Sequence, residues 1–114
     1  MSAFRVILFV FFASVLGYTV VVGINHGFGL FEVFFSDLAS MSWPGQFNLD
    51  FTTFLLLGGL WVAWRHHFSP AGIALGILVP IGGMLFLSSY LLLASFQTKG
   101  DIHELLLGKT RARR

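Results

Sequence analysis

Three long apolar stretches, almost free of charge, constrain the fold of this chain more than any other feature. They lie at residues 4–24, 44–64 and 70–96, and each is close to the roughly 20 residues that an α-helix needs to cross a membrane. Inside a bilayer every peptide group must be paired within the protein, which favours helices. Only 11% of the residues are charged, whereas soluble domains have about 25%. The sequence therefore predicts an all-α membrane protein, with residues 1–114 forming a single membrane domain.

The segments outside these spans predict smaller elements. Residues 29–41 repeat apolar side chains at helical spacing but include Glu32 and Asp37, so we expect a short interfacial amphipathic helix between the first two spans. A re-entrant segment is the alternative. The first span exceeds the apolar region of a signal peptide, so we expect it to remain part of the protein. Residues 97–114 predict a short helix and a basic tail that favours an anionic membrane surface.

The third apolar stretch is longer than a perpendicular crossing requires. Pro80, with Gly82 and Gly83 beside it, predicts a kink in this helix. With three crossings, we expect the basic tail on the same face as the loop at residues 25–43, and Arg65 on the other face. Because Lys and Arg would then be more numerous on the tail face, that face is expected to be cytoplasmic.

Asp50 is the acid that stands out, because it lies inside the second apolar stretch. The uncharged part of this stretch, residues 51–64, reaches only about 21 Å as a helix, so the span must include Asp50 to cross the bilayer. A carboxylate at membrane depth is costly, and such residues are usually paired and functional. Asp50 is therefore the centre of the predicted site.

Counting residues along straight helices suggests neighbours for this acid. Tyr18, Asp50 and Tyr90 each lie six residues, or about 9 Å, from the same face of the membrane. We expect a polar ligand-binding pocket between the three spans, lined by Asp50, Tyr18, Tyr90, Asn48, Gln46, His26 and Ser89. Two alternatives remain open: a hydrogen-bonded network that only locks the helices together, and an Asp50 that faces headgroup water near the start of its helix.

Small residues indicate where helices approach closely. Gly72 and Gly76 form a small-x-x-x-small pair on the third span, and Gly58 and Gly59 on the second span are the expected counterpart. No motif for a catalytic triad, a phosphate loop or a metal-dependent hydrolase is present, so no catalytic residue, metal ligand or cofactor is assigned. The adjacent residues His66 and His67 are interpreted as interfacial anchors.

A resemblance rests on the size of the chain, its three apolar spans and the stretch PGQFNLDF that begins the second span. In these features the chain resembles small bacterial membrane proteins that are grouped only as a domain of unknown function. The resemblance implies a bacterial inner-membrane location, and it implies neither an activity nor a catalytic residue.

Three functions are compatible with the sequence. The first is binding or transport of a small apolar or cationic molecule in the pocket around Asp50. The second is a non-catalytic accessory or scaffolding subunit, since a bundle this small is expected to self-associate or to join partner membrane subunits within the lipid bilayer. The third is an enzyme of lipid or isoprenoid metabolism. The net charge of +2 comes mainly from the tail and gives no sign of nucleic-acid binding.

Overall fold

The computed structural model describes residues 2–112, which form six helices and no strand. The three long helices are α1 (Ser2–His26), α3 (Trp43–Arg65) and α4 (Pro70–Gln97), and each is long and apolar enough to cross a membrane. The short helices are α2 (Leu30–Ala39), α5 (Ile102–Leu107) and α6 (Lys109–Ala112). The predicted all-α membrane fold class is therefore confirmed. Arg113 and Arg114 of the predicted basic tail lie outside the described residues.

Local sequence signals mark the starts of three of these helices. Ser69 caps α4, because its hydroxyl accepts a hydrogen bond from the Gly72 N–H at 3.1 Å, and Pro70 occupies the first turn. Asp101 caps α5 by accepting hydrogen bonds from the N–H groups of His103 and Glu104. Pro44 lies in the first turn of α3, where its missing N–H leaves no bond unmade.

The outer surface of the helices is strongly apolar. Phe9, Phe54 and Leu93, on three different helices, are each more than 60% exposed. Soluble proteins rarely expose apolar surface on this scale, whereas lipid tails cover such surface without penalty. The described residues therefore fit an integral membrane location.

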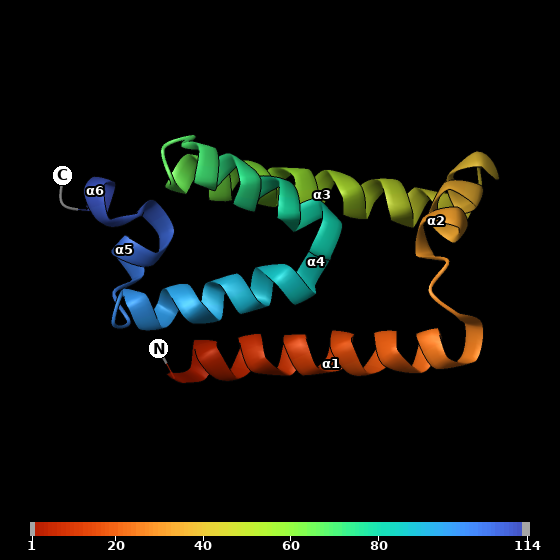
Figure 1. The fold of residues 1–114 in the computed structure, drawn as a ribbon, viewed down its shortest axis with the longest axis horizontal. Helices are drawn as coiled ribbons and strands as arrows, with labels where there is room; N and C mark the ends of the chain where they lie inside the picture. The colour runs from red at the N-terminus through yellow and green to blue at the C-terminus, as the bar shows by residue number, and fades with distance from the viewer. Residues whose placement is uncertain (1, 113–114) are drawn as a thin grey trace.

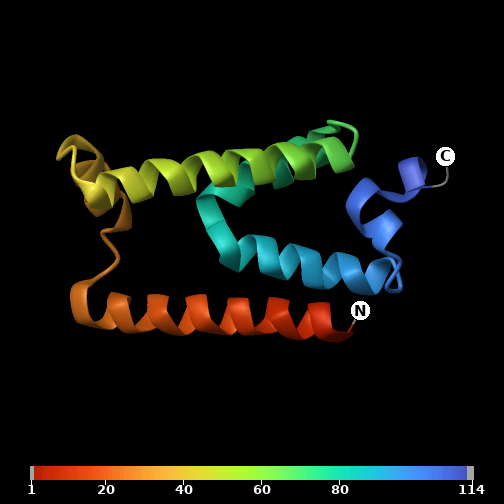
Figure 2. The ribbon, with the colours of Figure 1, turned by 180° about the vertical axis from the view of Figure 1, so that it is seen from behind.

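The third long helix reverses direction at Gly83. Gly83 has φ 59° and ψ −142°, a conformation outside the helical region, and Pro80 lies just before it. Residues 70–82 run along α3, and residues 84–97 return beside α1 toward the end at which α4 began (Figure 1). The same path is seen from behind in Figure 2. The predicted kink is confirmed, but it is a reversal rather than a bend within one crossing.

Side-chain contacts establish this reversal independently. In a straight helix Tyr90 would lie about 30 Å from Pro70. Instead, its hydroxyl lies 2.6 Å from Nε2 of His66, in the turn that precedes α4. At the same end, Arg5 of α1 donates hydrogen bonds to the hydroxyl and carbonyl oxygens of Ser95. Both ends of α4 therefore lie at one end of α3.

This path corrects the expected arrangement of faces. The tail helices α5 and α6 lie beside the start of α1, opposite the end that carries α2 (Figure 1). We call these two ends the basic end, which holds Arg5, Arg65 and α5–α6, and the α2 end, which holds His26, α2 and Trp43. The expectation that the tail shares a face with the loop at residues 25–43 is wrong, because it assumed that the third helix crosses the membrane without reversing.

Close backbone contact between glycines joins α3 to the first half of α4. A Cβ atom built on Gly59 would lie 2.4 Å from the Gly76 carbonyl oxygen, and one on Gly76 would lie 2.6 Å from that of Gly59. A Cβ on Gly72 would meet the Cβ of His66 at 2.5 Å, whereas one on Gly58 would lie at an ordinary 3.4 Å from Val79. The Gly59–Gly76 contact thus sets where α3 and α4 cross each other, and Gly58 lies at the margin of this contact.

The reversal can be measured with spin labels on cysteines introduced at Ala71 and Gln97, since the chain contains no cysteine of its own. In a continuous helix the two backbone positions would be about 39 Å apart. We expect a distance distribution centred well below that value in reconstituted protein. A single peak near 39 Å would contradict the reversal.

The glycine contact predicts unequal effects of two similar substitutions. Gly59→Ala should lower the free energy of unfolding by about 1–3 kcal/mol, because α3 and α4 must separate to accommodate the methyl group. Gly58→Ala is the matched control, since it brings the same gain in helix propensity with room for the added atom. Reversible unfolding of both variants in detergent micelles measures the difference, and equal stability of the two would refute this account.

Candidate functional site

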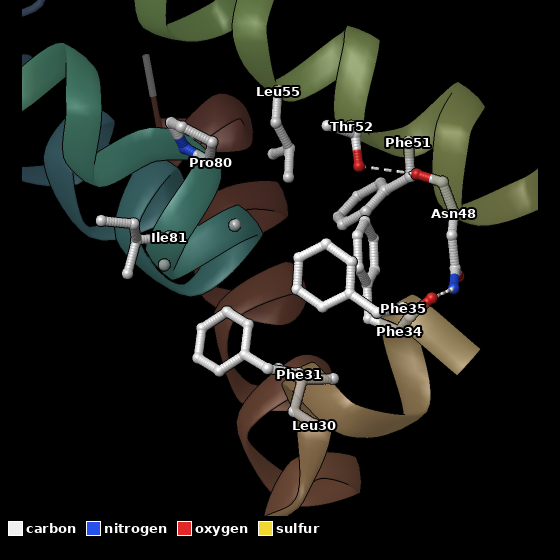
Figure 3. A pocket seen from close by; sticks show the side chains of 12 residues that line it. Leu30, Phe31, Phe34, Phe35, Asn48, Phe51, Thr52, Leu55, Pro80 and Ile81 are labelled. Atoms are coloured by element: carbon white, nitrogen blue, oxygen red, sulfur yellow. Dashed lines mark hydrogen bonds between the residues drawn. The ribbon is translucent and has the colours of Figure 1, made fainter. Parts of the chain in front are cut away.

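The reversal of α4 leaves part of the space between α1 and α3 without a helix, and a cavity lies there. Its volume is about 460 Å³, and it is bounded by α2, the first half of α3 and the break in α4 (Figure 3). Pockets of 300–1,000 Å³ are typical of small-molecule sites. The lining residues are Leu30, Phe31, Phe34, Phe35, Asn48, Phe51, Thr52, Leu55, Pro80, Ile81, Gly82 and Gly83.

Phenylalanine rings form most of the wall. Phe34 and Phe35 meet edge to face, with ring centroids 5.2 Å apart, and Phe31 lies one turn earlier on the same helix. Phe51 projects from α3 and would lie 3.7 Å from a Cβ atom on Gly83. Figure 3 shows the side chains of α2 and α3 converging on the space below Pro80 and Ile81. The cavity is therefore suited to an apolar molecule.

The broken helix forms one side of this wall. Pro80 has no N–H, so the carbonyl of Gly76, which faces Gly59 of α3, has no helical partner at residue 80. Helix ends leave N–H and C=O groups unpaired, and in membrane proteins broken helices are tolerated where they line a cavity. Residues 80–83 form part of this cavity wall, which fits that pattern.

Asn48 and Thr52 are the polar side chains of the cavity. Asn48 Nδ2 donates a 3.2 Å hydrogen bond to the Phe34 carbonyl and so ties α3 to α2. The Thr52 hydroxyl donates to the Asn48 carbonyl at 2.7 Å (Figure 3). Within the described residues, the Asn48 side-chain oxygen accepts no hydrogen bond. It is therefore available to a bound molecule.

A second hollow of about 370 Å³ lies between the end of α1 and the start of α2. Tyr18 and His26 line it, together with Phe28 and Leu30. The Phe28 ring turns back onto Gly23, where a Cβ atom would overlap it at 2.3 Å. Leu30 borders both hollows, which places them side by side at the α2 end.

The structure does not bring the predicted site residues together. Asp50 is exposed on the outer face of α3, in a shallow depression with Phe47 and Phe54, and Gln46 lies in another depression with Trp43. Tyr18 and His26 line the second hollow, and only Asn48 lines the main cavity. The expectation of one pocket around Asp50 is wrong in its geometry.

Tyr90 and Ser89 were expected at the wrong end, because their depth was counted along a straight α4. Because α4 reverses, Tyr90 lies at the basic end, where its ring stacks on Phe86 and meets Trp61 edge to face. The Ser89 hydroxyl donates to the Leu85 carbonyl of its own helix at 2.7 Å. Neither residue is near Asp50.

At the basic end, Arg65 joins α3, α4 and the tail. This side chain is only 9% exposed. Its Nε donates to the Leu105 carbonyl at 2.6 Å, Nη2 to the Glu104 carbonyl at 3.3 Å and Nη1 to the Tyr90 hydroxyl at 3.0 Å. The two carbonyls belong to the last turns of α5, where a cation is favoured. A buried guanidinium is thus hydrogen-bonded by helix-end carbonyls and a phenol in place of water.

Further contacts hold the tail against α3. Trp61 Nε1 donates to the Leu106 carbonyl at 3.0 Å. The Arg111 guanidinium lies 3.9 Å from the centre of the Trp64 ring and donates to the Trp64 carbonyl. The tail is therefore a docked part of the fold.

His66 completes the network with Tyr90. Burial lowers the pKa of His66 below its ordinary value of 6.5, and the positive charge of Arg65 and the neighbouring His67 lower it further. The imidazole is therefore neutral near pH 7 and can accept the 2.6 Å hydrogen bond from the Tyr90 hydroxyl. A neutral His66 suits a structural role beside a cation. In the described part of the chain, no three His, Asp or Glu side chains gather to hold a metal ion.

The sequence reasoning missed the cavity and the Arg65 cluster. Two signals pointed toward the cavity: the Phe-rich segment at residues 28–35 and the run Pro80–Ile81–Gly82–Gly83 in an otherwise regular helix. Neither indicates that the two segments meet. For the cluster, the sequence suggested only that His66 and His67, beside Arg65, are interfacial anchors.

Comparisons with protein-family models, curated proteins and solved structures found no match for this chain. The candidate site is therefore argued from its geometry alone.

The hairpin of α4 should weaken in mild acid because His66 joins its two ends through Tyr90. With the folded-state pKa of His66 below 6.5, the unfolded state binds the proton first, so this contribution is present above about pH 6.5 and is lost as the pH falls toward the lowered pKa. We expect the thermal midpoint to drop between pH 7.5 and 5.5, and to drop less in His66→Gln. Identical pH dependence of the two proteins would show that His66 does not contribute.

Proposed function

We propose that this protein binds a neutral lipophilic molecule with one hydrogen-bonding group, taken from the bilayer into the cavity at the break of α4. The observation that carries the proposal is the composition of the cavity wall. Four phenylalanine rings lie there beside a broken helix, and the Asn48 amide oxygen accepts no hydrogen bond from the described residues. Broken membrane helices commonly line binding sites.

The lining favours a neutral ligand over a charged one. In the part of the chain that the structure describes, no Asp, Glu, Lys, Arg or His contributes to the cavity wall. A charged group brought there would lose its hydration without gaining a counter-ion, which is unfavourable in a low-dielectric site. The cationic ligand expected around Asp50 therefore has no support in this cavity, and an alcohol, ketone or amide fits better.

The surroundings favour entry from the lipid. Phe31 and Phe35 are 64% and 62% exposed, so their rings border both the cavity and the outer apolar surface. A lipophilic molecule dissolved in the bilayer would reach the cavity past α2 without crossing water. The Asn48 side-chain oxygen would then accept a hydrogen bond from its polar group.

In the bilayer, we propose that α1 and α3 cross and that α4 is re-entrant. Residues 70–82 and 84–97 each reach only about 20 Å, which is less than the roughly 30 Å core. The described Lys and Arg side chains belong to Arg5, Arg65, Lys99, Lys109 and Arg111, all in segments at the basic end, whereas residues 25–42 contain none. The positive-inside rule supports a cytoplasmic basic end. The resemblance to small bacterial proteins favours the bacterial inner membrane.

A photoreactive lipophilic alcohol tests the binding proposal. The probe is a long-chain alcohol carrying a diazirine and an alkyne, cross-linked to the protein in liposomes and mapped by mass spectrometry. We expect saturable labelling of residues 30–35 and 48–55, displaced by the unmodified alcohol. Leu55→Trp should fill the cavity and weaken saturable labelling about tenfold, or about 1.4 kcal/mol.

Leu56→Trp is the matched control, because Leu56 is 56% exposed and does not line the cavity. It should leave labelling unchanged. Non-saturable labelling spread over the lipid-facing surfaces of α1 and α3, or equal labelling of the two tryptophan variants, would overturn the proposal.

A further inference from the structure

The outer face of α3 carries an exposed stripe with coiled-coil spacing. Its members alternate at intervals of four and three residues, which places them along one side of a helix. They are Trp43, Phe47, Asp50, Phe54 and Leu57, and we call this set the Asp50 stripe. Its four apolar members are between 66% and 74% exposed, and Asp50 is exposed with them.

The stripe lies opposite the face that α3 uses inside the molecule. Gly45 and Asn48 approach α2, and Gly59 approaches α4. These residues are offset from the stripe by roughly half a turn of the helix. The Asp50 stripe and the cavity have no residue in common, although Asn48 and Phe51 border both the cavity and the depression around Asp50.

Asp50 lies at membrane depth on this face. It follows the start of α3 at Trp43 by about 10 Å, within a helix of 23 residues. Hydrocarbon cannot solvate a carboxylate, and the short side chain of aspartate has little reach toward the headgroups. Among residues 2–112, no side chain donates a hydrogen bond to the Asp50 carboxylate, and its neighbours in the shallow depression are Phe47, Asn48, Phe51 and Phe54.

The described residues 2–112 do not supply a cation at this depth. Arg5 and Arg65 are at the basic end, where they hydrogen-bond to Ser95 and to the tail. His26 is the last residue of α1, beyond the depth of Asp50 at the α2 end. A second copy inserted in the same orientation would place the same groups at the same levels. Self-association therefore does not neutralise Asp50.

We propose that the Asp50 stripe docks a transmembrane helix of another membrane protein, and that a Lys or Arg side chain of that helix pairs with Asp50 inside the bilayer. Opposite charges attract strongly in a medium of low dielectric constant. Phe47 and Phe54, one turn to either side, would cover the pair and exclude water. The partner is thus defined by an apolar helix with one basic residue about 10 Å inside the membrane surface.

A designed helix provides the probe. It is a synthetic Leu/Ala-rich transmembrane peptide with a single Lys at the depth of Asp50, and its control has Leu at that position. Fluorescence energy transfer between labelled peptide and full-length protein in liposomes measures association. We expect the Lys peptide to bind at least tenfold more tightly than the Leu peptide, and Asp50→Asn to remove that preference.

Two further variants sharpen the test. Glu32→Gln also removes one negative charge but lies on α2, and it should leave binding unchanged. Asp50→Lys should reverse the preference toward a peptide with Asp in place of Lys. Equal binding of the Lys and Leu peptides, or a preference that survives Asp50→Asn, would overturn the proposal. Peptide-independent cross-linking of two copies through Phe47→Cys would also overturn it, because a second copy would then occupy the stripe.

Discussion

The reversal of α4 at Gly83 is the constraint on which the rest of the molecule depends. The backbone there adopts a positive φ that residues with a Cβ rarely tolerate, and Pro80 has already removed one helical hydrogen bond. Glycine contact with α3 holds the first half of the helix, and the contact of Arg5 with Ser95 holds the second half to α1. The hairpin is therefore fixed on both sides.

The reversal creates one empty region and one crowded region. At the α2 end, the missing half-helix leaves a space that α2 only partly fills, so aromatic rings surround a cavity. At the basic end, both ends of α4 meet the end of α3 and the tail, so Arg65 finds helix-end carbonyls and the Tyr90 hydroxyl within reach. The polar network closes the hairpin, and the apolar cavity lies at its turn.

Helix α3 separates two surfaces with different chemistry. Its inner face contributes Asn48, Thr52 and Gly59 to the cavity and the helix crossing. Its outer face carries Asp50 among exposed aromatic rings. Among the described residues, the cavity carries no charge and the Asp50 carboxylate has no partner, and the two lie on opposite sides of one helix. The two proposals, a lipophilic ligand and a partner helix, rest on this separation.

The sequence by itself determined the helical class, the approximate helix bounds and a break near Pro80. These follow from charge, spacing and local backbone chemistry, which act over a few residues.

The candidate site did not follow from the sequence, because the depth of each residue was counted along straight helices. Because α4 reverses, Tyr90 lies at the basic end, and Asp50 lies on the outer face of α3 without it. A proline and glycines can specify that a helix breaks, but the angle of the break is decided by contacts between distant segments: Gly59 with Gly76, Arg5 with Ser95, and Arg65 with Tyr90. Only the tertiary structure contains those contacts, and only it placed the cavity.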